Sequence, residues 1–133
     1  GCIHREYEAI VEGYVEQDQQ SIILPIGRKD TSIIEREVRA DGQFAHTDVS
    51  VIARKNNMSH IRLKLHTGRT HQIRVHMAHI GHPLVGDELY GGSRKLINRQ
   101  ALHCRSIQFE HPLTKENMHF CSKLPTEISS LII

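Results

Sequence analysis

The residues best suited to chemistry lie in one stretch, 65–76, whose sequence is LHTGRTHQIRVH. Residues 60–82 around it contain four arginines or lysines and six histidines but no carboxylate, so this part of the chain is locally positive. A glycine turn leading into a helix would add unsatisfied N–H groups and the positive end of a helix dipole. Such an end favours a phosphate, although an ordinary solvated helix start fits the same spacing.

Two other kinds of site fit the sequence less well. His76 and His79 are one helical turn apart, as metal ligands can be, but the nearest carboxylate, Asp87, follows a proline and a glycine. No metal site is therefore predicted. His103 and Cys104 cannot form a nucleophile pair, because neighbouring residues of a strand face opposite sides of a sheet.

Alternating apolar and polar residues dominate the chain and predict strands. The pattern is clearest at 61–66, where three aliphatic residues point to one side and three basic residues to the other. Similar alternation predicts further strands at 7–12, 34–38, 47–51 and 101–107. Compositions typical of turns separate them, at 27–30, 41–43 and 55–57. Hairpins are therefore expected to join most strands into one sheet.

One segment breaks the two-residue rhythm and predicts a helix. Its apolar residues recur at helical spacing over 70–80, where Thr70 is expected to cap the N-terminus and Gly81 to end the helix. A short second helix is expected after Pro125. Together these elements predict an α+β fold, a mixed and mainly antiparallel sheet with one well-defined helix, rather than a repeating βαβ array.

Composition limits the class of protein. A chain of 133 residues with 38% hydrophobic and 24% charged residues predicts one globular domain, 1–133. The net charge of +2 does not by itself identify a polyanionic partner. No apolar run approaches the roughly 20 residues that span a bilayer, and the N-terminus is not a secretory signal, so a cytoplasmic protein without a membrane partner is expected. The cysteines lack C-x-x-C spacing and are expected to be reduced thiols: Cys2, Cys104 and Cys121.

Two runs of the sequence together resemble one family of enzymes. They are 68–76, GRTHQIRVH, and 81–91, GHPLVGDELYG. Both runs, at this spacing, resemble the RNA pseudouridine synthases of the RluA and RluD type, the ribosomal large-subunit class. Further similarity to that family covers the strand at 5–13, the hairpin at 42–47 and the C-terminal strands over 102–125. The resemblance therefore extends over essentially the whole chain.

The resemblance implies a defined reaction. Enzymes of this family break the N-glycosidic bond of a uridine, rotate the uracil and rejoin it through carbon 5, without a metal or an organic cofactor. An aspartate in a His-Arg-Leu-Asp motif starts the reaction, by attack on the sugar or the base or by removal of a sugar proton. The aspartates of this sequence are Asp18, Asp30, Asp41, Asp48 and Asp87, and none stands in that motif. The chain is therefore expected to be the C-terminal portion of a catalytic domain whose aspartate lies upstream.

The resemblance also assigns roles to individual residues. Arg74 matches the arginine that pairs with the catalytic carboxylate, a charge-assisted bond that would keep the carboxylate ionised and oriented. Tyr7 matches the aromatic residue that stacks on the flipped uracil and is a candidate general base, although a strand residue packed in the core is the alternative. RNA contacts are expected from Lys64, Arg69, Thr70, His71 and Gln72.

Two functions are open for the chain itself. The parent protein is expected to modify structured RNA, ribosomal or transfer RNA, as a pseudouridine synthase. The isolated chain is expected to be inactive, because it lacks the aspartate and needs the missing N-terminal part of its own domain as a partner. The alternative is an RNA-binding half-domain without catalysis.

Overall fold

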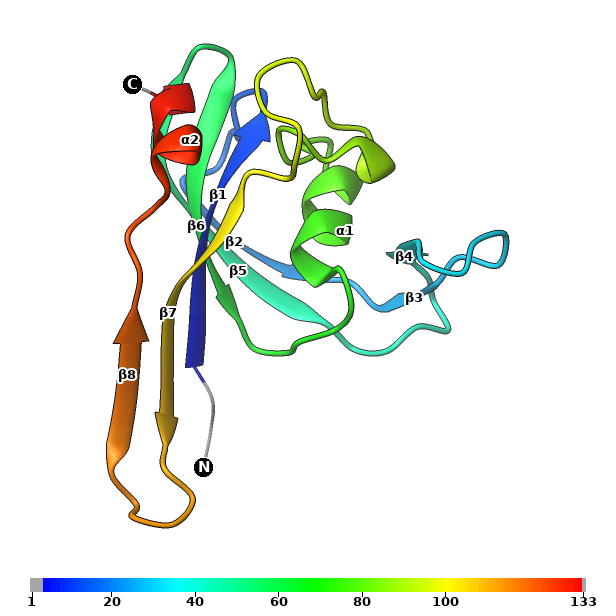
Figure 1. The fold of residues 1–133 in the computed structure, drawn as a ribbon. Helices are drawn as coiled ribbons and strands as arrows, with labels where there is room; N and C mark the ends of the chain where they lie inside the picture. Colours follow the sequence, from blue (N-terminus) through cyan, green and yellow to red (C-terminus); the bar gives the residue numbers. More distant parts are fainter. Residues whose placement is uncertain (1–3, 133) are drawn as a thin grey trace.

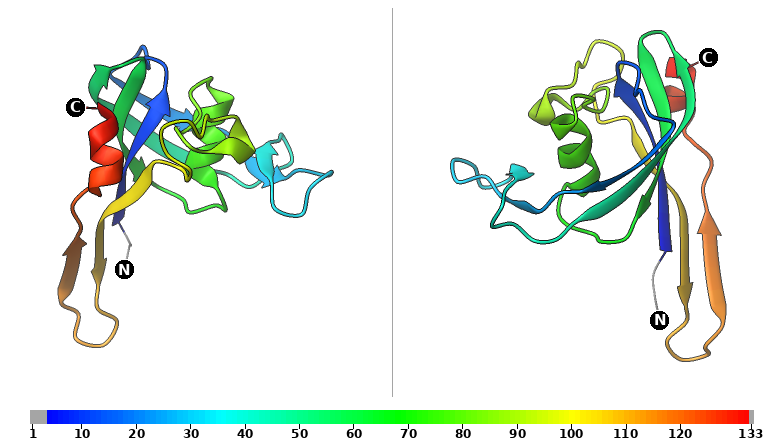
Figure 2. Two further views of the ribbon diagram at one scale, coloured as in Figure 1. Left: turned by 45° about the horizontal axis from the view of Figure 1, so that its top comes forward. Right: turned by 180° about the vertical axis from the view of Figure 1, so that it is seen from behind.

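The computed structural model describes residues 4–132 (Figure 1 and Figure 2). Its main sheet has the strand order β2-β5-β6-β1-β7-β8, and every pairing within it is antiparallel. A separate hairpin consists of β3 and β4. The strands are β1 (His4–Glu12), β2 (Gln19–Ile23), β3 (Ile26–Arg28), β4 (Arg36–Val38), β5 (His46–Lys55), β6 (Met58–Leu65), β7 (Leu102–Glu110) and β8 (Asn117–Cys121).

Two helices lie on opposite faces of the main sheet (Figure 1). One is α1 (Gln72–His79), which also contacts β4 and β5. The other is α2 (Thr126–Ser129), which continues into the 3-10 turn η2 (Ser130–Ile132). A further 3-10 turn, η1 (Glu88–Tyr90), lies against α1.

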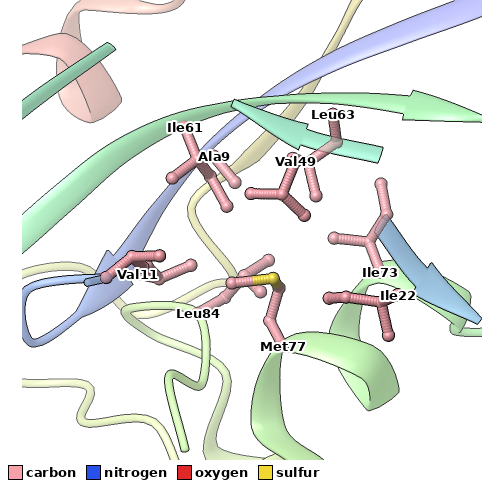
Figure 3. Close-up of a cluster of buried hydrophobic side chains, with 10 residues drawn as sticks. Ala9, Val11, Ile22, Val49, Ile61, Leu63, Ile73, Met77 and Leu84 are labelled. Carbon is pink, nitrogen blue, oxygen red and sulfur yellow. The ribbon is translucent and has the colours of Figure 1, made fainter. Parts of the chain in front are cut away.

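Alternation along β1 divides the hydrophobic core between these two faces. Ala9 and Val11 point toward α1, where they join the cluster that contains Met77 (Figure 3). Ile10, between them, points to the opposite face and packs in the cluster of Ile128 from α2. Each fully buried aliphatic or methionine side chain stabilises the fold by about 1.5–3 kcal/mol. Both helices are therefore anchored through one central strand.

The observed strands confirm the predicted alternation, with three differences. The strand expected at 34–38 is limited to Arg36–Val38, because Ile33 and Ile34 are exposed in the loop before it. The turn expected at 27–30 is wrong for its first two residues, which belong to β3. Alternation also did not reveal the two outer strands of the sheet, β2 and β8, since an edge strand buries few side chains.

The helix predicted over 70–80 is confirmed but is shorter, and its N-terminal cap was predicted wrongly. His71 occupies the cap position in the left-handed region, with φ 58, and no side chain caps the helix. Thr70 is exposed one residue earlier. At the other end Gly81 has φ +92, and its N–H donates to the Ala78 carbonyl at 3.0 Å, as predicted for a glycine that ends a helix. The short helix after Pro125 is also confirmed.

Two expectations, one about membrane-spanning segments and one about the cysteines, concern residues that the structure describes. None of the helices in residues 4–132 is long and apolar enough to cross a membrane. Cys104 and Cys121 are free thiols, while Cys2 lies outside the described residues.

Candidate active site

A cavity of about 370 Å³ opens between the sheet and the N-terminal end of α1. Tyr7 lines it from β1, while Arg69, His71 and Arg74 line it from α1 and the loop before it. The other lining residues are Leu65, Gln72, Ile73, Gln100 and Leu102. No carboxylate is among the described residues of this wall, and Arg69, which pairs with no carboxylate among the described residues, leaves the cavity positive. Such a cavity attracts an anionic group.

Asp87 fixes the guanidinium of Arg74 at the edge of this cavity. Nε and Nη2 of Arg74 donate to the two carboxylate oxygens of Asp87, at 3.0 and 2.8 Å. The Asp87 side chain is 1% exposed and the Arg74 side chain 15% exposed, so solvent screens the pair little. The hydrogen bond to Asp87 is the largest cause that raises the pKa of Arg74. Within residues 4–132, Nη1 of Arg74 forms no hydrogen bond and is left for another acceptor.

A glycine makes the approach of Asp87 to Arg74 possible. Gly86 has φ +82, and a Cβ atom there would lie 1.9 Å from the carbonyl oxygen of Arg99. Only glycine tolerates both the backbone conformation and this contact. The chain can therefore turn sharply enough after the helix to bury the Asp87 carboxylate.

Tyr90 holds Arg74 from a second side. Its ring centroid lies 4.9 Å from Cζ of Arg74, within the range of a cation–π contact. Its hydroxyl accepts a hydrogen bond from the Arg36 N–H of β4 at 3.0 Å and lies 2.6 Å from Nδ1 of His71. Burial, the largest cause, and the nearby charge of Arg74 lower the pKa of His71, which keeps its ring neutral. Contacts from η1 and β4 therefore hold the Arg74 side chain of α1 in place.

Tyr7 lies half-buried on β1, opposite Leu63 of β6 and Cys104 of β7. Burial is the main cause that raises the pKa of Tyr7, and the contact with Cys104 raises it further. The phenol therefore stays protonated at neutral pH, and any base role would use a neutral hydroxyl rather than a phenolate. The roles of Tyr7 and Arg74 stay predictions, but the structure brings both side chains to one cavity.

Gln72 is buried at the start of α1, and its side-chain amide organises the preceding loop. Its Oε1 accepts hydrogen bonds from the hydroxyl of Thr67 and the N–H of Arg69, at 2.7 and 3.0 Å. Its Nε2 donates to the hydroxyl oxygen of Thr47 and the carbonyl of His46, at 2.8 and 3.0 Å. Both acceptor positions of Oε1 and both N–H groups of Nε2 are therefore bonded within the protein, and the amide has no free donor for RNA. Contact between Gln72 and RNA stays a prediction, and its geometry favours a positioning role.

His76 continues the same buried network on the inner face of the sheet. Its Nδ1 lies 2.9 Å from the hydroxyl of Thr47, and its Nε2 lies 2.9 Å from the carbonyl of Leu24. Burial, the largest cause, lowers the pKa of His76, so the ring is neutral and Nε2 donates to Leu24. Both ring nitrogens have partners in the protein, which leaves neither for a metal ion.

The other predicted RNA contacts lie in three places. Arg69 and His71 line the cavity, and Arg69 is held by a 2.7 Å hydrogen bond from Nε to the Phe44 carbonyl. Thr70 is exposed beside an adjoining cavity of about 250 Å³, which Arg69 also lines. Lys64 lies apart from both, because alternation along β6 directs its exposed side chain to the outer face of the sheet. The structure therefore does not bring Lys64 to the cavity.

Sequence reasoning did not identify Asp87 and Tyr90 as partners of Arg74. Asp87 is 13 residues from Arg74, beyond the end of α1, and no local spacing reveals such a contact. The one available signal is that both residues lie in the 81–91 run that carries the resemblance.

Relatives with known names match nearly all of this chain. Uncharacterized RNA pseudouridine synthase YjbO of Bacillus subtilis (strain 168) is 52% identical over 132 residues, which are 99% of this chain and 47% of YjbO. Ribosomal large subunit pseudouridine synthase D of Pseudomonas aeruginosa is 41% identical over 144 residues, 98% of this chain and 45% of the relative. The chain thus spans a little under half the length of these curated relatives.

Solved structures show the same fold. Human RNA Pseudouridylate Synthase Domain Containing 1 superposes with a TM-score of 0.82 at 26% identity, over 96% of this chain and 58% of the human chain. A family model described as RNA pseudouridylate synthase matches residues 1–79, which include Tyr7, Arg74 and the whole 68–76 run. Since that match covers more than half of the sequence, the chain belongs to the RNA pseudouridylate synthase family, with relatives of the RluD type.

Proposed function

We propose that these residues form the C-terminal portion of the catalytic domain of an enzyme that isomerises uridine to pseudouridine in structured RNA. The observation that carries the proposal is the positive cavity that brings Tyr7 and Arg74 together without a carboxylate. Ribosomal RNA is the proposed substrate, because several relatives are named ribosomal large subunit pseudouridine synthase D. The proposed location is therefore the cytoplasm, with RNA as the partner.

The reaction defines what the cavity has to accommodate. The bond between N1 of uracil and C1′ of ribose breaks, and a bond between C5 and C1′ forms. The proton on C5 leaves to solvent and N1 gains a proton, so the isomerisation needs no oxidant or reductant. The target uridine must leave its stack to reach a pocket of this kind.

Arg74 is proposed to hold the catalytic aspartate of the preceding part of the domain. Its Nη1 is free among the described residues, whereas Asp87 and Tyr90 immobilise the rest of the guanidinium. A donor fixed in advance stabilises a developing charge without reorganising during the reaction. Tyr7 is proposed to stack against the extruded uracil, with its neutral hydroxyl near the reacting base.

A release assay with RNA that carries tritium at uridine C5 tests this proposal. We expect release by a longer protein that includes the preceding part of the domain, and none by the 133-residue chain alone. Arg74→Met should abolish release in the longer protein, while Arg94→Met, at a half-exposed arginine paired with Glu88, should not. Turnover by the 133 residues alone would contradict the assignment of the nucleophile to the missing part.

The second candidate function is RNA binding without catalysis. The observation that favours it is the same carboxylate-free wall, because five aspartates are present and none lines the cavity. If the longer protein binds RNA but releases no tritium from any ribosomal or transfer RNA, this alternative replaces the enzymatic one.

A further inference from the structure

A second group of polar side chains lies on the outer face of the sheet, at the start of β5. Thr47 points inward, so its neighbours His46 and Asp48 point outward together. His66 directly follows β6, and its N–H donates to the carbonyl of His46 at 3.1 Å, which places it beside them. Two adjacent strands therefore present two imidazoles and one carboxylate to the same point.

The atoms of this group are close enough to bind one ion. Nε2 of His46 lies 2.9 Å from Oδ1 of Asp48, and Nε2 of His66 lies 2.6 Å from Oδ2. All three ligand atoms lie within 4.8 Å of one another. We propose that His46, Asp48 and His66 form a binding site for one divalent transition-metal ion such as Zn²⁺. The site does not depend on the proposed RNA chemistry.

The donor set suits that class of ion. Two imidazole nitrogens and one carboxylate oxygen are ligands that zinc binds, and a fourth position would remain open to water. Ser21 of β2 donates a 2.6 Å hydrogen bond to Oδ1 of Asp48, which orients the carboxylate from outside the ligand set. That hydrogen bond, followed by the one from His66, lowers the pKa of Asp48 to about 2.

Metal binding requires a modest local change. The rings of His46 and His66 are stacked, with centroids 4.0 Å apart and an interplanar angle of 21°, so their lone pairs do not yet converge. The His66 side chain is 39% exposed and has room to turn about its Cβ–Cγ bond. Each Nε2 must also give up its proton, to Nδ1 or to solvent, before it can coordinate. Lys64 lies opposite Asp48 on β6, and its positive charge predicts moderate affinity.

Titration of the metal-free 133-residue chain with Co²⁺ tests this proposal. We expect one equivalent to bind with visible d–d absorption, and Zn²⁺ to displace it. Asp48→Asn, which keeps the side-chain shape, and His66→Ala should each lose the absorption. Ser21→Ala should weaken binding by about tenfold, as for other groups that orient a ligand. His79→Ala, which removes an exposed histidine of α1, should change nothing.

Circular dichroism of each variant checks that it is folded before the titration. No absorption at any Co²⁺ concentration up to the millimolar range would overturn the proposal, and would leave a hydrogen-bonded His-Asp-His cluster only. Binding of several equivalents that persists in Asp48→Asn and His66→Ala would overturn it equally, because it would come from scattered histidines.

Discussion

Two adjacent residues of β5, Thr47 and Asp48, place polar side chains in contrasting surroundings on the inner and outer faces of the sheet. Thr47 is fully buried and joins Gln72 and His76 in a network in which the ring is neutral. Asp48, the next residue, stays ionised among partly exposed histidines. On the inner side each donor has one partner and a fixed position, which is what a preorganised site requires. On the outer side the partly exposed His46, Asp48 and His66 can exchange partners with solvent or with an ion.

Asp87→Asn should produce the largest loss of stability. It removes one charge of a buried bidentate pair and leaves Arg74 poorly compensated, which costs about 3–5 kcal/mol. Glu88→Gln is the matched control, because the neighbouring Arg94–Glu88 pair has side chains 50% and 71% exposed and contributes at most about 1 kcal/mol. Urea unfolding of both variants measures the contrast. Equal losses would show that burial does not distinguish the two pairs.

The contrast between the buried and the exposed ion pair could not be predicted from the sequence, although much of the fold could. Alternation identified the inward residues of β1, β5 and β6, because a period of two directly encodes which side of a strand is buried. The local positive charge of 65–76 also indicated where the cavity lies. The partners of Arg74 could not be found in that way, since they depend on how the chain returns after α1. The left-handed backbone conformation of His71 could not be predicted either, because the residue type at that position does not indicate it.

Thr47→Val should have the next largest effect. Valine keeps the shape of the side chain but leaves Nδ1 of His76 and one N–H of Gln72 without a partner, which costs about 1–3 kcal/mol. Ser50→Ala, three residues after Thr47 and on the outward-facing side of β5, should change stability by less than about 0.5 kcal/mol. Thermal and urea unfolding compare the two. An effect of Thr47→Val no larger than that of Ser50→Ala would refute the importance of the buried network.

The smallest expected effect is the pH dependence that Asp48 contributes. Its folded pKa of about 2 lies below its ordinary value of 3.8, so its stabilisation is complete above about pH 4. This contribution is lost as the pH falls from about 4 through 2. With a chelator present, the difference in unfolding free energy between the native chain and Asp48→Asn should shrink over that range. A difference that stays constant from pH 5 to pH 2 would show that Asp48 is not held ionised by its neighbours.

Arg74→Lys in the longer protein tests most directly whether the clamped guanidinium serves the reaction. Lysine keeps the charge but lacks the planar fork that bonds both oxygens of Asp87 and directs a separate donor toward the catalytic carboxylate. Misplacing such a group predicts a fall of about 10²-fold or more in the rate of tritium release, measured on folded protein with saturating RNA. Arg94→Lys should leave the rate unchanged. A folded Arg74→Lys protein that releases tritium at the native rate would contradict the role of Arg74.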